Sequence, residues 1–391
     1  MRIGIVTATY LPSKNGVATS TALFVRGLRA LGHEVRVFAP EHLRRGNAPE
    51  FGVWRLPSTG IGAPEDYPLL LPVGAAALAK LAAHDFDVVH AMHPFVAGQL
   101  ALRLARQRNV PLIFTAHTQY HQYLHYARLP RRLGRLMVRR HVRAFARAAD
   151  AVLIPGQAMG ESLRRYKYRG DVTLLPNPVD LSAFGSIGSM GGSAVRVRHG
   201  IPAQVPLLVY LGRLAPEKNL EVLLAAFAQA LADMPDARLL MVGDGPSRAA
   251  LERRAQHLPV VFAGGAPYDQ VPHYLGAADT FVTASTSEVL PMSMIEALAA
   301  GAPLIAARSP AAEDLVQDGV NGSLCEPDAA SLAAGMVRIL TGGNLALLQA
   351  GARRSAQAFD VLSLARQLQE VYASAIARRT FVPDALRPEV A

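Results

Sequence analysis

The sequence predicts an α/β protein with two doubly wound domains, each built on a parallel β-sheet. Short apolar strands alternate with longer helical patterns from the N-terminus to about residue 178, and a second series of the same kind follows. A length of 391 residues exceeds one usual core. With 51% hydrophobic and 18% charged residues, the composition is that of a packed globular protein.

The first series supplies six predicted strands with helices between or after them. Its continuous apolar runs are typical of parallel strands buried on both faces. The predicted strands are Arg2–Ala8, Glu34–Phe38, Asp87–Ala91, Leu112–Thr115, Ala151–Pro155 and Val172–Pro176, and the clearest helices are Ala18–Leu31 and Val96–Arg108.

The second series begins after GSIGSMGGSA at 185–194, a glycine-rich stretch that predicts a loop or mobile segment. A domain boundary is expected near Asn177–Phe184, giving domains 1–178 and 179–364. Ligands of such sheets bind beyond the carboxyl ends of the strands, so two facing sheets would form a cleft. The predicted strands are Leu207–Leu211, Ala237–Val242, Val260–Ala263, Thr280–Thr283 and Leu304–Ala307.

Cysteine usage and apolar runs indicate a cytoplasmic protein. The single cysteine, Cys325, excludes an intrachain disulfide framework and suits a reducing compartment. The start MRIGIVTATYLPSKNG is typical of a strand and a loop, not of a signal peptide. No apolar run reaches the roughly 18–20 residues that a spanning helix needs.

The net charge of +10 is unevenly distributed along the chain. Residues 1–200 carry 26 Lys and Arg against 11 Asp and Glu, whereas residues 201–391 carry 14 against 19. Between Asp87 and Asp150 there is no acidic residue. A face of one sign attracts a partner of the opposite sign, so the first half is expected to meet something anionic.

The stretch SEVLPMSMIEALAAG at 287–301 combines features that suit one ligand. Pro291 fits the first turn of a helix that Gly301 ends, and the start of that helix can hold a phosphate. Glu288 precedes the helix and Glu296 lies inside it, where carboxylates can accept hydroxyl hydrogen bonds. A nucleotide sugar satisfies all three, with sugar at Glu288 and ribose at Glu296. Two solvated helix glutamates are the alternative.

Three more loops fall at predicted strand ends in the same sheet. They read GRLAPEKN at 212–219, VGDGP at 242–246 and VFAGG at 261–265. Arg213 and Lys218 follow Gly212, where two cations can hold a diphosphate. Ordinary surface charge is the alternative for these two residues, but it does not explain why all the loops lie at one sheet edge.

In this order the motifs resemble the retaining nucleotide-sugar glycosyltransferases of the GT-B fold, in family four. FAGG is followed by the Glu-x7-Glu stretch and by EDLVQDGVNG at 313–322, and the resemblance covers nearly the whole chain. It is greatest to the bacterial diacylglycerol glycosyltransferases and phosphatidylinositol mannosyltransferases. It implies two Rossmann-like domains facing across a cleft, retention at the anomeric carbon, and no metal or other cofactor.

The resemblance also implies roles for individual residues. Arg213 and Lys218 would hold the donor phosphates, Glu288 the transferred sugar, Glu296 the ribose, and the segment around Gly264 would lie beside the nucleobase. The catalytic set is thus His117, Arg213, Lys218 and Glu288, and the donor-binding set is Gly16, Gly212, Gly243, Gly264, Leu290, Pro291, Met292 and Glu296.

The first half fits the family with one departure. Where the family often has paired glycines, this chain has Asn15-Gly16-Val17, so only Gly16 is carried over. FTAHT at 114–118 matches the strand-end histidine, and His117 would point into the cleft. A hydrogen-bonded structural histidine is the alternative, and proton transfer by His117 does not follow. A helix in Asp360–Arg378, about 365–391 in the domain scheme, would cross back onto the N-terminal domain.

Metal and dinucleotide signals are discounted. Asp85-Phe86-Asp87 precedes a strand, which is the wrong end for a ligand site, so it is interpreted as strand-entry polarity. His117, His121 and His125 have helical spacing but lack an acidic or cysteine partner. No G-x-G-x-x-G is present.

The acceptor side is predicted in residues 118–147. Its arginines step by three and four along one helix face, with apolar residues nearby, which favours attachment to anionic lipid. The alternative is a solvated basic helix packed by its leucines. The arginines are Arg132, Arg135, Arg139, Arg143 and Arg147, the apolar residues are Leu133, Leu136, Met137 and Val138, and Tyr120, Tyr123 and Tyr126 precede them.

The predicted function is transfer of a hexose to a membrane lipid such as diacylglycerol, at the inner face of the cell membrane. UDP-glucose or UDP-galactose is the first expectation for the donor and GDP-mannose the second. A soluble saccharide or metabolite acceptor remains the competing reading. A nucleic-acid-binding protein would also use the arginines, but it leaves the donor loops unexplained.

Overall fold

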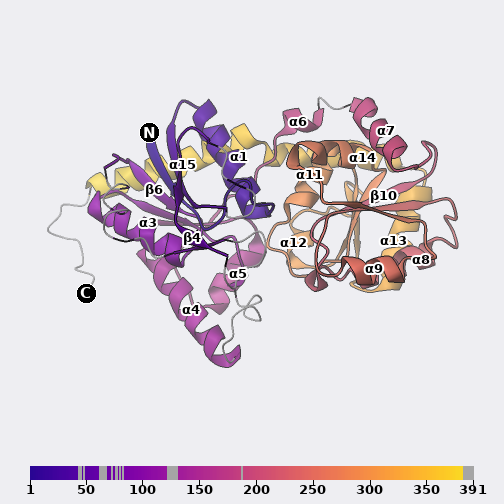
Figure 1. The fold of residues 1–391 in the computed structure, drawn as a ribbon, viewed down its shortest axis with the longest axis horizontal. Coiled ribbons are helices and arrows are strands. Elements are labelled where there is room, and N and C mark those ends of the chain that lie inside the picture. The colour runs from indigo at the N-terminus through magenta and orange to yellow at the C-terminus, as the bar shows by residue number, and fades with distance from the viewer. Residues whose placement is uncertain are drawn as a thin grey trace. The chain divides into compact units, whose positions relative to one another are not determined.

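The computed structural model describes residues 1–42, 46, 49–60, 68–71, 74, 78, 81, 83–120, 131–185 and 188–381. The chain divides into two compact units. The first comprises Met1–Pro178 and the segment from Val361 onward, and the second is Val179–Asp360 (Figure 1). The two units are the two Rossmann-like domains that the sequence predicts, and each is described by itself.

The first unit is built on a parallel sheet in the order β3-β2-β1-β6-β7-β8-β9. This order, which reverses between β1 and β6, is the Rossmann order. The strands are β1 (Arg2–Val6), β2 (Glu34–Pro40), β3 (Val53–Leu56), β6 (Val88–Ala91), β7 (Leu112–Thr115), β8 (Ala151–Ile154) and β9 (Thr173–Leu174), with a separate antiparallel pair of β4 (Ser58–Thr59) and β5 (Leu69–Leu70).

The helices of the first unit are α1 (Gly16–Ala30), α3 (Val96–Gln107), α4 (Arg131–Ala148), α5 (Gln157–Arg165) and α15 (Val361–Phe381). α15, drawn in yellow, runs beside α1 although more than 300 residues separate them in the chain (Figure 1). A Cβ atom on Gly27 would lie 2.8 Å from the Cβ of Ala365. The side chain of Ala365 on α15 therefore packs directly on the backbone of α1 at Gly27.

Buried contacts fix α15 to this sheet. His90, on β6, contacts the Tyr372 hydroxyl through Nδ1 at 2.7 Å and the Thr115 hydroxyl through Nε2 at 2.7 Å. Tyr372 is fully buried, and burial raises its pKa well above the ordinary value. His33 reaches the side chain of Gln369 at 2.9 Å. The last described helix is therefore part of the core of the first unit.

The second unit repeats the topology with six parallel strands in the order β12-β11-β10-β13-β14-β15. The order reverses between β10 and β13, so this sheet also has a switch point where ligands bind. The strands are β10 (Leu207–Leu211), β11 (Arg238–Val242), β12 (Val260–Gly264), β13 (Thr280–Thr283), β14 (Leu304–Ala307) and β15 (Gly322–Cys325).

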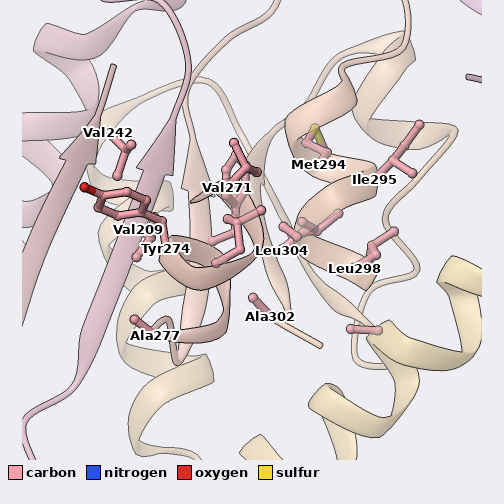
Figure 2. Packing of buried hydrophobic residues seen from close by; sticks show 14 of the residues in the cluster. Val209, Val242, Val271, Tyr274, Ala277, Met294, Ile295, Leu298, Ala302 and Leu304 are labelled. Carbon is pink, nitrogen blue, oxygen red and sulfur yellow. The ribbon is translucent and has the colours of Figure 1, made fainter. Parts of the chain in front are cut away.

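Helices and apolar side chains cover both faces of the second sheet. One face packs against α10 and α11, as the cluster of Val209, Val271, Ile295, Leu298 and Leu304 in Figure 2 illustrates. The other packs against α8 and α13. The helices are α6 (Leu181–Gly185), α7 (Gly188–Arg198), α8 (Leu220–Ala230), α9 (Arg248–Arg254), α10 (Val271–Gly276), α11 (Met292–Ala300), α12 (Pro310–Glu313), α13 (Ala329–Thr341) and α14 (Leu345–Ala356), with short 3-10 turns at Pro216–Lys218, Tyr268–Gln270 and Gln357–Phe359.

The loop predicted at 185–194 is wrong, because α7 occupies most of it. One of its glycines, Gly192, serves close packing. A Cβ atom on Gly192 would lie 2.4 Å from the backbone oxygen of Gly276. α7 thus approaches α10 more closely than a larger residue would allow, and Val195 on the same helix is buried in the core. Gly192 therefore serves a helix contact and not a flexible linker.

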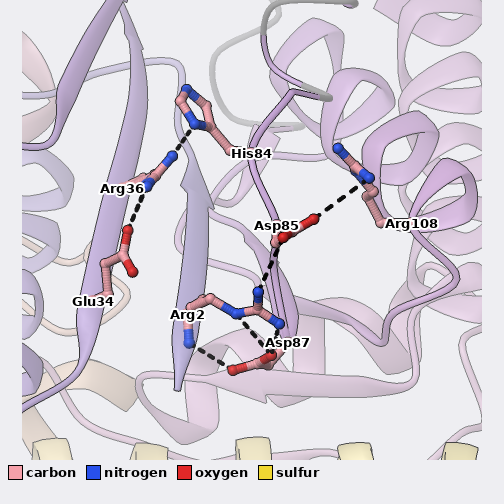
Figure 3. A network of polar contacts seen from close by, with 7 residues as sticks. All are labelled: Arg2, Glu34, Arg36, His84, Asp85, Asp87 and Arg108. Atoms are coloured by element: carbon pink, nitrogen blue, oxygen red, sulfur yellow. Dashed lines mark hydrogen bonds and ion pairs between the residues drawn. The ribbon is translucent and has the colours of Figure 1, made fainter.

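A polar network lies where β1, β2 and β6 begin (Figure 3). The Asp87 carboxylate accepts hydrogen bonds from the backbone N–H of Arg2 at 2.7 Å and from its guanidinium at 2.8 Å. Asp85 pairs with Arg2 at 3.2 Å and with Arg108 at 3.6 Å. Burial raises the pKa of Asp87, but the hydrogen bonds and the charge of Arg2 outweigh it and hold this pKa below its usual value. Both carboxylates therefore serve strand entry, as the sequence predicts.

In the described part of the chain, no single helix combines the length and apolarity needed to cross a membrane. The bent pair Ala329–Thr341 and Leu345–Phe359 passes that test together, by length and composition only.

Candidate active site

The loops that leave β10 and β13 meet at the point where the second sheet reverses its order. One loop carries Gly212, Arg213 and Lys218, and the other carries Glu288 and leads into α11. The carboxyl ends of adjacent parallel strands lie at one sheet edge, which is where ligands of doubly wound sheets bind. We call this set of loops, from residues 212–219, 242–246, 264–265 and 284–292, the donor edge.

Backbone hydrogen bonds join the glycine loops of the donor edge to one another. Gly212 N–H donates to the Val242 carbonyl at 2.9 Å, and Gly243 N–H donates to the Gly264 carbonyl at 2.8 Å. Gly243 has φ of +145°, and a Cβ there would lie 1.8 Å from the Gly212 oxygen. Only glycine fits this position. The loops therefore present a layer of backbone that a ligand can approach closely.

Lys218 and Glu288 form an ion pair across the two loops at the switch point. Both side chains are about four-fifths buried. The Ser285 hydroxyl also donates to the Glu288 carboxylate at 3.2 Å, and the Asn219 side chain donates to the Ala284 carbonyl at 3.3 Å. Asn219 has φ of +52°, the left-handed conformation that asparagine tolerates. These contacts hold the cation and the carboxylate in one place.

Arg213 differs from Lys218 because its side chain is exposed. Its backbone is held by the buried Tyr210 hydroxyl, which donates to the Arg213 carbonyl at 3.0 Å. Among the described residues, no hydrogen bond or ion pair to the Arg213 guanidinium is present. The site thus has one cation already paired and a second one available to an anion.

α11 begins at Met292, with Pro291 at the N-cap position in an extended conformation. The prediction that Pro291 lies within the first turn is therefore wrong by one residue. Proline still fits at the N-cap, because the backbone N–H that it lacks would form no hydrogen bond within the helix there. Leu290 and Met292 are buried and anchor this end. The first turn has no acidic residue, so its free N–H groups and partial positive charge favour an anion.

Glu296 lies one turn into α11 and is only 4% exposed. Burial raises the pKa of this carboxyl from 4.5 to about 7, and a hydrogen bond with Tyr268 partly offsets the rise. The helix ends at Gly301, which has φ of +82° as predicted for a helix-ending glycine. A buried carboxyl that is half ionised near neutral pH costs stability, and such groups are frequent at functional sites.

A second set of loops lies where β1, β6 and β7 end in the first unit, which we call the acceptor edge (residues 7–16, 92–95 and 116–120). Asn15 caps α1, because its Oδ1 accepts from Ala18 N–H at 3.0 Å, while its amide donates to the Thr9 hydroxyl at 2.8 Å. Gly16 is the exposed first residue of α1. Asn15, which stands where the family often has a glycine, thus caps α1 and holds the loop that precedes it.

Three histidines gather at the acceptor edge. His93 Nδ1 accepts from the backbone N–H of Ala8 at 3.1 Å, which fixes the loop after β1. Burial lowers the pKa of His90 to about 3 and that of His93 to about 4. The pKa of the half-buried His117 is also lowered to about 3. Burial is the main cause, and the nearby His93 and His90 lower it further. All three are therefore neutral at ordinary pH and suited to hydrogen bonding.

His93 is the residue of this edge that sequence reasoning missed. The signal was present in HAMHP at 90–94, where a histidine directly follows a strand. His117 has the same position after β7 and was found through its family motif. Tyr123, Tyr126, His121 and His125 lie outside the described residues.

The exposed surface of α4 carries both the arginines and an apolar stripe. Arg132, Arg135 and Arg139 are exposed, whereas Arg143 is half-buried. Leu133, Leu136 and Met137 are 50%, 55% and 54% exposed. The alternative of a basic helix packed by its leucines does not hold for these three residues, because the inner face of α4 uses Val142, Phe145 and Ala146 instead.

Comparisons with known proteins identify the class. Residues 14–183 match Glycosyltransferase Family 4, and residues 193–353 match Glycosyl transferases group 1. Together with the two Rossmann-type sheets, these matches define a glycosyltransferase of the GT-B type. The chain belongs to glycosyltransferase family four.

Among curated relatives, the chain is 32% identical over 330 residues to the alpha-monoglucosyldiacylglycerol synthase of Streptococcus pneumoniae, covering 83% of this chain and 75% of that protein. It is 31% identical over 339 residues to a GDP-mannose-dependent alpha-mannosyltransferase of Mycolicibacterium smegmatis, covering 84% and 85%. A sucrose-phosphate synthase structure from Thermosynechococcus elongatus has the same fold, with a TM-score of 0.78 at 24% identity over 97% of this chain and 100% of that one.

Proposed function

We propose that this glycosyltransferase moves a hexose from a nucleotide sugar to a membrane lipid such as diacylglycerol, with retention and without a metal. UDP-glucose or UDP-galactose is the expected donor. The main support for a nucleotide-sugar donor is the Lys218–Glu288 pair beside the start of α11, at the switch point of the second sheet. Relatives named for glucosyldiacylglycerol synthesis support the acceptor half.

At the donor edge, the diphosphate would lie between Arg213, Lys218 and the α11 N-terminus. These groups are already in place, so they stabilise the negative charge that develops on the leaving diphosphate. When phosphate takes Lys218, Glu288 is released to accept hydrogen bonds from hydroxyls of the transferred sugar. Glu296 would receive the ribose hydroxyls from inside α11.

In the transfer step, the acceptor hydroxyl attacks the anomeric carbon on the face that the diphosphate leaves. The bond from that carbon to the diphosphate oxygen breaks, the new glycosidic bond forms, and the hydroxyl proton passes to the departing phosphate oxygen. His117 is neutral, and its pKa of about 3 makes it a poor base, so we assign it a hydrogen bond to the sugar or the acceptor.

At the acceptor side, α4 would hold the protein at an anionic membrane surface. Its arginines meet lipid phosphates, and its three exposed apolar side chains enter the interface. The helix could also bind nucleic acid by charge. However, Phe145 is its one aromatic residue and is 2% exposed, so it cannot stack on bases. The surface fits lipid better.

A panel of nucleotide sugars tests this proposal. UDP-glucose, UDP-galactose and GDP-mannose are each supplied with diacylglycerol in phosphatidylglycerol vesicles, or with soluble saccharides. The expected product is a glycolipid with an α-linkage by NMR. A β-linked product would contradict retention. A product formed only with soluble saccharides would favour the competing acceptor, and one formed only from GDP-mannose would favour the mannosyltransferases among the relatives.

A further inference from the structure

A pocket of about 320 Å³ lies in the first unit beside α3 and α4, and it shares only Phe95 with the acceptor edge. Its apolar walls are Leu78, Phe95, Val96 and Leu100, and its polar residues are Gln99, Arg103 and His141. On α3 the lining residues recur at intervals of three and four, so they share one helix face. The volume is within the range of small-molecule sites.

The pocket adjoins the acceptor edge through Phe95. Phe95 follows His93 by two residues, and its ring meets that of Tyr120 edge-on with centroids 4.8 Å apart. Tyr120 in turn follows His117 by three residues. The Phe95 ring also stacks on His141 of α4, with centroids 4.9 Å apart. One side chain therefore joins the pocket, the acceptor edge and α4.

Contacts hold this wall in place. His141 Nε2 donates to the Pro94 carbonyl at 2.8 Å, which fixes the ring that Phe95 stacks on. A Cβ atom on Gly98 would lie 2.3 Å from the His93 oxygen, so α3 packs directly on the segment leading to Phe95. The Phe95 and His141 side of the pocket is thus held by packed helices.

The character of the pocket suits a hydrocarbon chain. Its mainly apolar walls offer few partners to ordered water. Val96 is 40% exposed, so the pocket opens to solvent at the first residue of α3. None of the described residues that line it is acidic, and Arg103 is exposed with no ion pair to a described residue. An arginine without an acidic neighbour allows the pocket to approach an anionic membrane.

We propose that this pocket binds one acyl chain of the glycerolipid acceptor. A chain held there would place the polar end of the lipid beside Phe95, at the edge where His93 and His117 lie. The exposed leucines of α4 would attach the protein to the bilayer, and the pocket would draw one lipid out of it. The inference rests on the proposed lipid acceptor, but it is tested through binding and not through transfer.

The test uses dihexanoyl phosphatidylglycerol with a diazirine in one acyl chain, kept below the concentration at which it forms micelles. After illumination, mass spectrometry locates the label. The pocket predicts label on peptides containing residues 95–103 and 141, which excess unlabelled dihexanoyl phosphatidylglycerol removes. Glycerophosphoglycerol, the head group without chains, should not remove it. Label confined to residues 133–137, or removed equally by the head group, would overturn the inference.

Two variants and a matched control test whether the labelling depends on the pocket. Gln99→Trp fills the pocket and should lower labelling about fivefold, whereas Gln107→Trp, the same exchange at an exposed position of α3 outside the pocket, should not. Val96→Asp should lower it about tenfold, since a carboxylate repels the chain. Asp suits the first turn of a helix, so this variant should fold. Unchanged labelling in folded Val96→Asp contradicts the inference.

The outcomes separate this inference from the proposed function. If the protein transfers sugar to diacylglycerol but the pocket is not labelled, the acyl-chain inference is wrong and the proposed function stands. If the pocket is labelled but no lipid accepts the sugar, the proposed lipid acceptor is wrong and the pocket still binds lipid.

Discussion

Lys218 and Glu288 neutralise each other at the donor edge, although 70 residues separate them in the chain. The same two side chains are expected to serve the phosphate and the sugar of the donor. Donor binding would therefore replace one partner of each residue, with phosphate taking the lysine and sugar hydroxyls taking the carboxylate.

Glu288→Gln should separate binding from turnover. Lys218 would then no longer be held by the Glu288 carboxylate, so UDP should bind as tightly as to wild type or up to about fivefold more tightly, in keeping with a pair of modest strength. Turnover should fall about 10- to 100-fold, because a charged hydrogen bond to the sugar is lost. Calorimetry measures the affinity for UDP, and product assays measure turnover. Glu370→Gln, on exposed α15 surface, is the control, and weaker UDP binding by Glu288→Gln would contradict the exchange.

Arg213→Ala and Lys218→Ala should each lower turnover by about 10²- to 10³-fold, the scale for removing one group placed to stabilise developing charge. The loss should be larger in kcat than in KM if the charge develops mainly as the diphosphate leaves. Steady-state kinetics with saturating acceptor measures it. Near wild-type kcat for both variants would remove these residues from the leaving-group site.

Stability should depend on pH through Glu296. Its pKa is about 7 in the folded protein and near 4.5 when unfolded, so the folded state binds the proton more tightly. The resulting contribution to stability is complete below about pH 4.5 and is lost as pH rises through about 7, up to about 3 kcal/mol. Urea unfolding from pH 5 to 8 should show this fall in wild type but not in Glu296→Gln. Parallel pH curves for the two proteins would show that Glu296 titrates normally.

Exchanging Arg132, Arg135, Arg139 and Arg143 for Gln should weaken binding to anionic vesicles strongly, since each Arg near such a surface contributes about 1 kcal/mol. Wild-type binding should also fall with salt, because exposed charges are screened. Vesicle co-sedimentation measures both. The matched control exchanges four exposed arginines elsewhere, Arg253, Arg254, Arg354 and Arg366, with the same change in charge.

Equal sedimentation of the α4 variant and wild type would remove the docking surface and favour a soluble acceptor. Donor hydrolysis in the absence of acceptor should persist in the α4 variant, because the donor edge belongs to the other unit.

Chelation should leave activity unchanged. Arg213, Lys218 and the start of α11 are proposed to do what a divalent cation does for other diphosphate leaving groups. Assays in excess EDTA, with and without added Mg²⁺ or Mn²⁺, check this. Activity that EDTA abolishes and either ion restores would contradict the proposal.

The strands of both sheets were predictable because parallel strands buried on both faces are continuous apolar runs. β7, β10, β13 and β14 have the predicted bounds, and the others that were predicted differ by at most two residues at either end. β3 and β15 were not predicted, and in β15 the sequence GSLC has too few apolar residues to stand out. α7 was mistaken for a loop, since composition does not distinguish a flexible glycine from one at a close helix contact.

The candidate site was predictable as a set of residues but not as a set of contacts. Spacing placed Glu288 and Glu296 on either side of one helix start, but pairing with Lys218 and the burial of Glu296 arise from tertiary packing. Periodicity likewise gave the arginine face of α4. It could not tell that Leu133, Leu136 and Met137 face solvent, because an exposed apolar stripe and a buried one have the same pattern.

The place of α15 has a consequence for how the protein is made. Leu364, Leu368, Tyr372 and Ala375 complete the core of the first unit, whose sheet is formed by residues synthesised long before them. During translation, the second unit is a continuous segment and can fold as soon as residues 179–360 have left the ribosome. The first unit must wait with an apolar face uncovered until residues 361–381 follow. The unit that starts first is therefore the one that finishes last, and it is the one that chaperones would need to protect.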